Sequence, residues 1–201
     1  MSKAEKTKQL IIEKTAALFN TKGYIATSLS DITQATGLTK GSIYGNFENK
    51  DEVAIEVYKY NAGLLSQTIN RSFGDEYPTA VKKLKAFVDF YRKNWPIVFS
   101  NGGCPLMNAA TEADDSFPAL KKHVKNSFTI WMTKVSEVIL QGQKTGEISK
   151  KVSAEQYASL FIMLIEGGIL LSKTLGDQSY LDRALDKISH MIDHELTILP
   201  S

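Results

Sequence analysis

Apolar residues recur every three or four positions along most of the chain, which is the period of an amphipathic helix. These stripes predict helices over residues 2–22, 28–36, 39–47, 50–70, 79–95, 104–113, 116–144, 154–175 and 180–196. No stretch shows the strict alternation of apolar and polar residues that is typical of a strand. We therefore expect an all-α protein of about nine helices.

Polar residues at the ends of two short predicted helices are typical start and stop signals. Ser28 with Asp31 three residues later forms a capping box, which marks a helix start. Gly37 supplies the positive φ angle with which a chain leaves a helix, and Thr39 can cap the helix that follows. The segment 27–47 therefore predicts two short helices joined by a tight turn.

Similar signals divide the rest of the chain. Ser153 with Gln156 predicts one helix start, and Ser179 with Asp182 predicts another. Pro96 is expected to end the helix before it, because proline lacks the N–H group that a helix interior uses. The result is a series of helices separated by short breaks.

The two short helices over residues 27–47 are typical of a helix-turn-helix. Ile43 and Phe47 are four residues apart and form the inward face of the second helix. The polar residues near the N-terminal end of that helix are left pointing outward. In a helix-turn-helix, this end of the second helix enters the major groove of DNA.

The sequence GYIATSLSDITQATGLTKGSIYGNFENKDEV at residues 23–53 resembles the DNA-binding segment of the TetR (TetR/AcrR) family of bacterial transcriptional regulators. The resemblance runs from Leu10 to Val57, about the first quarter of the chain. Two positions depart from the family pattern. Asn46 replaces the usual histidine, and Gly45 stands where a side chain is normal, so the DNA sequence of a relative's operator does not transfer to this chain.

The resemblance implies a ligand-responsive transcriptional regulator, and repression dominates in that family. It implies a helix-turn-helix DNA-binding domain at residues 1–48 and an effector-binding and dimerisation domain at residues 49–201. The expected partners are a palindromic double-stranded DNA operator, a small-molecule effector and a second copy of the chain. No cofactor is expected.

Eight residues are the candidate DNA contacts. Thr27, Tyr44 and Lys50 are assigned to phosphates. Base edges or close approach of the backbone are assigned to Lys40, Gly41, Ser42 and Asn46. Thr27 and Tyr44 also have a purely structural interpretation, as packing or capping residues. The full set is Thr27, Thr39, Lys40, Gly41, Ser42, Tyr44, Asn46 and Lys50.

An apolar effector cavity is expected among the fifth, sixth, seventh and eighth predicted helices. Aromatic and methionine side chains with a few polar groups are typical of small-molecule pockets, and equally of solid cores. Cys104 follows two glycines at a helix start, which can make a thiol reactive, although a buried inert cysteine is commoner. The candidate lining is Phe87, Phe90, Tyr91, Trp95, Cys104, Met107, Asn108, Phe128, Trp131, Met132, Phe161 and Glu166.

Apolar stripes on the last two predicted helices suggest a dimer interface. Stripes of this kind are as often part of a protein's own core. The family resemblance favours the interface, because in TetR-like proteins these two helices pair with their symmetry mates in a four-helix arrangement. The expected interface residues are Tyr157, Phe161, Leu164, Leu171, Leu181, Leu185, Ile188 and Ile192.

Composition and charge add little to this picture. The chain is 43% hydrophobic and 23% charged, with a formal net charge of +2. Residues 1–50 hold seven lysines against four acidic residues, a net of +3, and the remainder carries a net of −1. A basic first segment suits contact with phosphates, although an asymmetry this small does not identify a DNA-binding protein.

Patterns typical of enzymes, metal sites and membrane segments are missing from the sequence. His190 and His194 have metal-ligand spacing without a third ligand beside them. The apolar stretch at 160–171 contains Glu166 and two glycines, so we expect it to be too short and broken to span a membrane. With one cysteine and no apolar leader, a cytoplasmic protein is expected.

Two alternatives to a ligand-responsive regulator remain at this point. One is a small-molecule carrier or enzyme with an incidental helix-turn-helix, and the other is a DNA-binding module without an effector. The large apolar body favours the regulator, because DNA binding alone does not need it.

Overall fold

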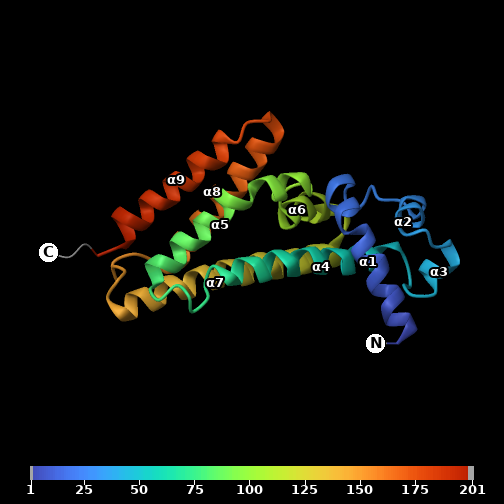
Figure 1. The fold of residues 1–201 in the computed structure, drawn as a ribbon, viewed down its shortest axis with the longest axis horizontal. Coiled ribbons are helices and arrows are strands. Elements are labelled where there is room, and N and C mark those ends of the chain that lie inside the picture. The colour runs from blue at the N-terminus through green and yellow to red at the C-terminus, as the bar shows by residue number, and fades with distance from the viewer. Residues whose placement is uncertain (1, 199–201) are drawn as a thin grey trace. The chain divides into compact units, whose positions relative to one another are not determined.

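The computed structural model describes residues 2–198 as a series of helices (Figure 1). Within these residues the only strand-like pairing is an isolated antiparallel bridge between Ile148 and Thr197, which confirms the all-α class. The helices are α1 (Lys3–Lys22), α2 (Leu29–Thr36), α3 (Lys40–Tyr44), α4 (Lys50–Arg71), α5 (Ala80–Ser100), α6 (Pro105–Ser116), α7 (Pro118–Thr145), α8 (Ala154–Leu175), α9 (Ser179–Met191) and a π-helical turn, η1 (Ile192–Leu196).

The chain divides into two compact units. The first unit combines the residues up to 65 with residues 101–127, and the second combines residues 66–100 with those from 128 onward. Helices α4 and α7 therefore each contribute residues to both units. This division does not follow the domain boundary predicted after residue 48, because α6 belongs to the same compact unit as the N-terminal helices.

The core of the first unit is built from buried aromatic and branched side chains. Phe19 at the end of α1 lies 5.8 Å from the ring of Tyr24, which in turn lies 5.9 Å from the ring of Tyr58 on α4. Ile32 of α2 and Ile43 of α3 are both fully buried. These contacts hold the short helices, which would be marginal on their own.

Local signals set the ends of α2 and α3 as the sequence predicts. Ser28 and Asp31 form the capping box, and the backbone N–H of Asp31 donates to Ser28 Oγ at 3.2 Å. Gly37 has a φ angle of 71°, the left-handed value that glycine accepts most readily. Thr39 caps α3, which ends at Tyr44 rather than at the predicted residue 47 because Gly45 ends it.

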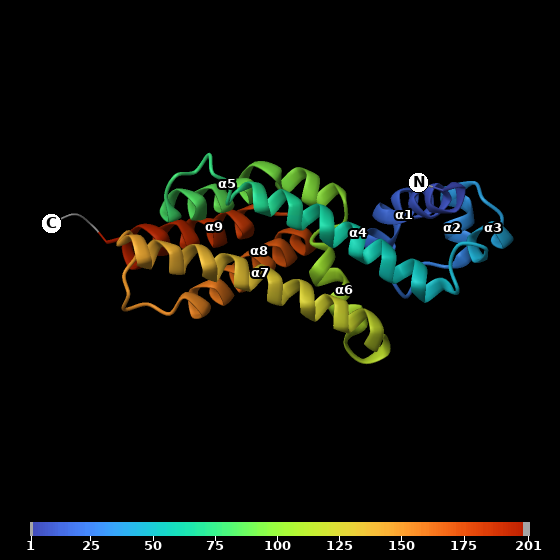
Figure 2. The same ribbon diagram turned by 90° about the horizontal axis from the view of Figure 1, so that it is seen from below.

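In the second unit, α8 and α9 lie side by side and α5 packs against α9 (Figure 1, Figure 2). The α8–α9 contact depends on a glycine. A Cβ atom at Gly168 would lie 3.0 Å from the Cα atom of Leu181, so a larger residue would push the two helices apart. The side chains of Phe87, Ile165 and Leu185 are buried in this unit.

Two predicted helix boundaries are wrong. Helix α5 continues through Pro96 to Ser100. Pro96 is exposed, so water can hydrate the carbonyl that loses its N–H partner, and the rings of Trp95 and Phe99 pack 5.4 Å apart across the same turn.

Ser179 does not cap α9. The helix begins at Ser179 itself, and the carboxylate of Asp177 accepts hydrogen bonds from the Ser179 N–H and hydroxyl groups, both at 2.9 Å. The Asp177 carboxylate therefore caps the start of α9, a role that the spacing of Ser179 and Asp182 predicted for the Ser179 side chain.

Helix α8 is more apolar than the sequence interpretation allowed. It runs unbroken for 22 residues, and an 18-residue window within it has a mean hydropathy of 1.6, so it is long and apolar enough to cross a membrane by length and composition alone. One side of it packs into the second unit through residues such as Phe161 and Ile165. A core helix of this kind meets the same criteria, and its exposed side is described below.

Candidate functional site

The N-terminal end of α3 presents a polar, accessible surface. Thr39 and Lys40 are exposed, and the Tyr44 side chain is 41% exposed although it is aromatic. A Cβ atom at Gly41 would meet nothing closer than Thr39 Oγ1 at 3.9 Å, so the backbone there is open to a close approach. The first unit does not bury these groups, and they are available to a ligand.

Two other predicted contacts are partly engaged within the chain. The Asn46 side-chain amide donates to the carbonyl of Ser42 at 2.9 Å. Lys50 Nζ donates to the carbonyl of Ile25 at 2.7 Å. An ammonium group has three donors, so this bond leaves Lys50 with hydrogen-bonding capacity for a phosphate.

The predicted phosphate contact at Thr27 is wrong. Its side chain is 0% exposed, and its hydroxyl donates to the carbonyl of Gly23 at 2.6 Å. Thr27 therefore shapes the turn between α1 and α2, as the structural interpretation of this residue proposed.

Electrostatic contacts fasten α2 to α1. Lys22 Nζ lies 2.5 Å from Asp31 Oδ2, and Ser28 donates to the same oxygen from both its backbone and its hydroxyl. The hydrogen bond from Lys22, followed by those from Ser28, holds the pKa of the Asp31 carboxyl well below its usual range. The negative charge is thus fixed at the start of α2, where a helix dipole favours it.

A similar arrangement fastens α1 to α4. Lys8 Nζ lies 2.8 Å from Glu52 Oε1 and 4.7 Å from the centre of the Phe47 ring. The hydrogen bond from Lys8, and then the N–H of Glu48, lowers the pKa of the Glu52 carboxyl. Ion pairs therefore connect α1 both to α2 and to α4.

The sequence interpretation missed a polar connection from α6 to the α1–α2 turn. The carboxylate of Glu112 accepts hydrogen bonds from the backbone N–H groups of Tyr24 at 3.0 Å and Ile25 at 2.9 Å. One turn earlier on α6, Asn108 donates to the side-chain oxygen of Asn20 at 3.0 Å. The partners are more than 80 residues apart, and no local sequence pattern marks such contacts.

Comparison with known proteins identifies the family of this chain. Residues 11–57 match the sequence model described as bacterial regulatory proteins, tetR family, and residues 80–188 match the one described as tetracyclin repressor-like, C-terminal domain. The chain belongs to the TetR family. It is a DNA-binding transcriptional regulator, and α2 and α3 are its helix-turn-helix.

Individual relatives agree with this assignment over almost the whole chain. A TetR-family transcriptional regulator from Cytophaga hutchinsonii is 35% identical, with a TM-score of 0.93 and coverage of 100% of this chain and 99% of its own. One from Chloroflexus aurantiacus is 31% identical, with a TM-score of 0.90 and coverage of 99% and 100%. The transcriptional repressor DhaR of a Mycobacterium species is 25% identical over 89% of this chain and 88% of its own length.

The predicted effector-binding residues separate into the two units of this TetR-family protein. Cys104, Met107 and Asn108 belong to the first unit. The Asn108 amide donates to Asn20 and, at 2.8 Å, to the carbonyl of Gly102, so it fixes a turn. Cys104 is buried immediately before α6, and its side chain makes no capping hydrogen bond there.

Four of the predicted effector-binding residues form an aromatic cluster on α5 and α7 in the second unit. Phe87 lies 6.4 Å from the Trp131 ring, edge-on, while Tyr91 and Phe128 each stack on Trp131 at 6.3 Å. Trp131 is 5% exposed, and its Nε1–H has no hydrogen-bond partner among the residues that the structure describes. Most buried donors in proteins have a partner, so this indole N–H is a candidate donor to a bound acceptor.

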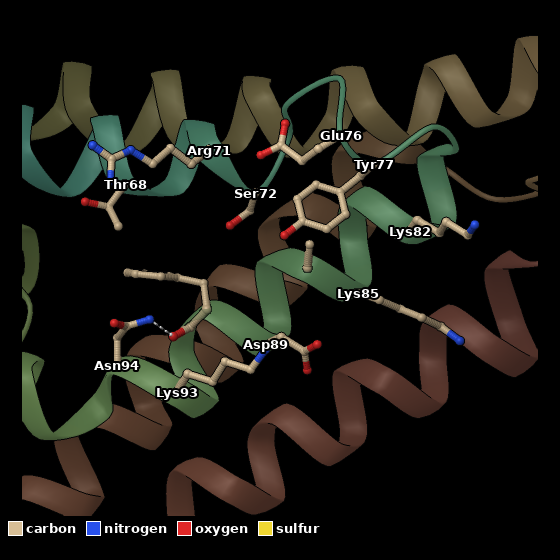
Figure 3. A pocket seen from close by; sticks show the side chains of 12 residues that line it. Thr68, Arg71, Ser72, Glu76, Tyr77, Lys82, Lys85, Asp89, Lys93 and Asn94 are labelled. Carbon is tan, nitrogen blue, oxygen red and sulfur yellow. Dashed lines mark hydrogen bonds between the residues drawn. The ribbon is translucent and has the colours of Figure 1, made fainter.

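A cavity of about 550 Å³ lies in the second unit, between the end of α4, the following loop and α5. Ser72 and Tyr77 lie at its centre, and charged side chains surround them (Figure 3). Phe90 is the one predicted effector-binding residue in its lining, so this cavity is more polar than the one expected. The full lining is Thr68, Arg71, Ser72, Glu76, Tyr77, Lys82, Lys85, Ala86, Asp89, Phe90, Lys93 and Asn94.

The predicted dimer stripe lies largely in the core of the protomer. A side chain that its own protomer covers has no surface for a partner, so the interface prediction is wrong for five residues. Their exposed fractions are 0% or 1%: Phe161, Leu181, Leu185, Ile188 and Ile192.

The remaining stripe residues are more accessible, and α8 exposes others beside them. Leu171 is 46% exposed, Leu164 is half-buried, and the Tyr157 hydroxyl donates to Glu195 at 2.7 Å. We use the name α8 outer face for the exposed apolar residues of this helix. They are Leu160, Met163, Leu170, Leu171 and Leu175.

The two histidines with metal-ligand spacing lie with their ring centres 4.5 Å apart. Within residues 2–198, no group of three or more His, Cys, Asp or Glu side chains is placed to hold a metal ion.

Proposed function

We propose that this TetR-family regulator is a repressor that binds a palindromic operator as a homodimer and is released by a small molecule. The proposal rests on one combination of features. The polar end of α3 is exposed, and the same chain contains a second unit with its own aromatic core. DNA binding alone does not need the second unit. Repression is proposed because DhaR is named a repressor. A cytoplasmic location is proposed because a regulator must reach the DNA that it binds.

We assign base contacts to the exposed start of α3 and phosphate contacts to its flanks. Lys40, Gly41 and Ser42 are the proposed base-reading residues, whereas Tyr44 and Lys50 are the proposed phosphate contacts. The exposure of Lys40, Gly41 and Tyr44 supports this assignment. We add Thr39, which caps α3, and Asn46, which lies two residues beyond its end.

We assign the dimer interface to the α8 outer face. Its five apolar side chains are exposed in the protomer, and Gly167 between them has nothing within 4 Å of a Cβ position, so a second helix can approach closely. Large exposed apolar patches mark interaction sites, since water is a poor solvent for them. A two-fold dimer would present two helix-turn-helix segments to two half-sites of a palindrome.

We assign the effector to the aromatic cluster around Trp131. The unpartnered indole N–H supports a ligand with an apolar body and a hydrogen-bond acceptor, such as a carbonyl or ether oxygen. Aromatic walls with few, well-placed polar groups are typical of small-molecule sites. We expect Trp131→Phe to weaken such a ligand while it preserves the packing.

A binding experiment with DNA from beside the protein's own gene tests the proposal. We expect a sequence-specific complex that a small molecule dissociates, and the operator should weaken the binding of that molecule by the same factor. Equal affinity for this DNA and for random duplex would support a DNA-binding module without an effector. Tight ligand binding with unchanged operator affinity would instead favour a carrier, and turnover of the ligand an enzyme.

A further inference from the structure

Glu112 binds the backbone of the turn that leads into the helix-turn-helix. Its Oε1 accepts the N–H of Tyr24 at 3.0 Å, and its Oε2 accepts the N–H of Ile25 at 2.9 Å. Hydrogen bonds to a charged acceptor are about twice as strong as those between neutral groups. One side chain of α6 therefore holds two successive peptide groups between α1 and α2.

The turn is shaped to receive this carboxylate. Gly23 has a φ angle of 107°, and a Cβ atom there would lie 2.9 Å from Glu112 Oε2. Any other residue would be strained by its backbone and would also displace the carboxylate. Gly23 and Glu112 thus depend on each other.

The carbonyl groups of the same turn also accept hydrogen bonds from side chains. The Ile25 carbonyl accepts from Lys50 at the start of α4, and the Gly23 carbonyl accepts from Thr27. Three residues beyond Ile25, Ser28 caps α2. The path of this turn therefore determines where α2 begins, and α3 follows α2 after a short connection.

A second contact places α6 against the end of α1. Asn108 lies four residues before Glu112 and hence on the same side of α6. It donates to the carbonyl and the side-chain oxygen of Asn20, whose own amide donates to the Gly103 carbonyl at 3.1 Å and to that of Asn101. Asn20 is 8% exposed, so these bonds are shielded from water.

We propose that Glu112 is a positioning residue for DNA binding, through which α6 fixes the α1–α2 turn and with it the orientation of the helix-turn-helix. Glu112 does not itself need to touch DNA. A shift of α6 would move the acceptor away from two backbone donors and leave the turn free to change its path. The proposal deepens the regulatory function, because it names the residue through which α6 reaches the reading helices.

The test compares Glu112→Ala and Glu112→Gln with Asp114→Asn in the full chain. Asp114 is an exposed acidic residue on the same helix, paired with Lys121, so its replacement reproduces the change in net charge. We expect Glu112→Ala to lower specific operator affinity about tenfold or more, and Glu112→Gln to lower it less because its amide oxygen can accept one bond. Affinity for random duplex should match that of Asp114→Asn.

Two outcomes would overturn the proposal. One is an operator affinity for Glu112→Ala equal to that of the Asp114→Asn control. The other is a parallel loss of specific and random-duplex binding together with a lower unfolding temperature, which would show that Glu112 only stabilises the fold.

A measurement without DNA keeps the contact testable if no operator is found. Amide hydrogen exchange at Tyr24 and Ile25 should become faster in Glu112→Ala, while exchange in α8 stays unchanged. Gly23→Ala should also lower the unfolding temperature less in the Glu112→Ala background than in the wild type, because the carboxylate that its Cβ would meet is gone. Unchanged exchange at both amides would contradict the proposed contact.

Discussion

The helix-turn-helix and α8 leave opposite kinds of surface exposed. Helices α2 and α3 bury their few apolar side chains, such as Ile32 and Ile43, and expose polar groups around Lys40. Helix α8 buries Phe161 and Ile165 on one side and exposes Met163, Leu170 and Leu175 by 61%, 50% and 56% on the other. The two regions therefore suit different partners.

The difference follows from what each surface gains by binding. A polar helix end that carries a lysine gains binding free energy from contacts with phosphates and base edges. These contacts leave the buried core of the unit in place. An apolar helix face gains only when water is removed from it, which requires an equally apolar partner. A second copy of the same face meets that requirement in a two-fold dimer.

The largest expected effect comes from a charge at a fully buried position of α9. Leu185→Asp should unfold the second unit, at a cost of about 3–5 kcal/mol, because it removes a 0%-exposed side chain and buries a charge. Circular dichroism at 25 °C and the urea midpoint check this. A folded, monomeric Leu185→Asp protein would show that Leu185 belongs to the interface after all.

The same charge on the α8 outer face should separate protomers without unfolding them. Leu171→Glu should give a folded monomer in sedimentation and lose about 100-fold or more in operator affinity, since each monomer binds only a half-site. Ile97→Glu is the matched control, because Ile97 is an exposed apolar residue on another helix, α5. Leu171→Glu that remains dimeric would remove the α8 outer face from the interface.

Most sequence signals with a local cause were correct, apart from those at Pro96 and Ser179. Ser153 and Gly176 bound α8, and its range of 154–175 was predicted correctly, because capping and left-handed glycine depend only on neighbouring residues. The helix-turn-helix was recognised for the same reason. Its polar residues either cap a helix or point outward, and few alternatives exist.

Several errors occur where a side chain's partner is distant in the sequence, whereas those at Pro96, Ser179 and Thr27 have local causes. An apolar stripe at Leu185 and Ile188 predicts a buried face, but its period does not say whether the chain itself or a second copy covers it. The hydrogen bonds of Glu112 were not predicted, because its partners are the backbone N–H groups of Tyr24 and Ile25 and no sequence pattern identifies them. Thr27 was misassigned because a threonine before a helix can equally contact phosphate or its own backbone.

A smaller effect should distinguish Lys40 from Lys50 on the DNA-binding surface. Lys40 is exposed, with Nζ 5.9 Å from the centre of the Tyr44 ring, so Lys40→Ala should reduce operator affinity about tenfold and relax specificity at one base pair. Lys50→Ala should weaken operator and random duplex alike and reduce the salt slope by about 1. Affinity measured at several salt concentrations on both DNAs checks the contrast, and identical behaviour of the two variants would contradict it.

Loss of the N-cap of α2 should have a smaller effect than the substitutions above. Ser28→Ala removes the acceptor of the Asp31 N–H and should lower the stability of the helix-turn-helix by about 1 kcal/mol. Hydrogen exchange in α2 measures this locally. Ser153→Ala, which removes the corresponding cap of α8, should have a similar cost in the second unit and leave α2 unchanged. An effect of Ser28→Ala on α8 would show that the two regions do not respond separately.

The smallest expected effect is a pH dependence confined to the helix-turn-helix. Hydrogen bonds from Lys22 and Ser28 hold the pKa of Asp31 below its ordinary value of 3.8. The stability that this charge supplies is therefore fully present above the ordinary pKa and is lost as the pH falls through the lowered one. The wild type should be more stable than Asp31→Asn near neutral pH, and the difference should shrink below about pH 4.

Unfolding temperatures of both proteins between neutral and acidic pH test this. The control is Asp75→Asn, because Asp75 is an exposed residue of the α4–α5 loop. Because ion pairs at exposed positions are weakened by salt, added salt should reduce the same difference at neutral pH. A difference that is constant across pH would show that Asp31 acts through its hydrogen-bond geometry and not through its charge.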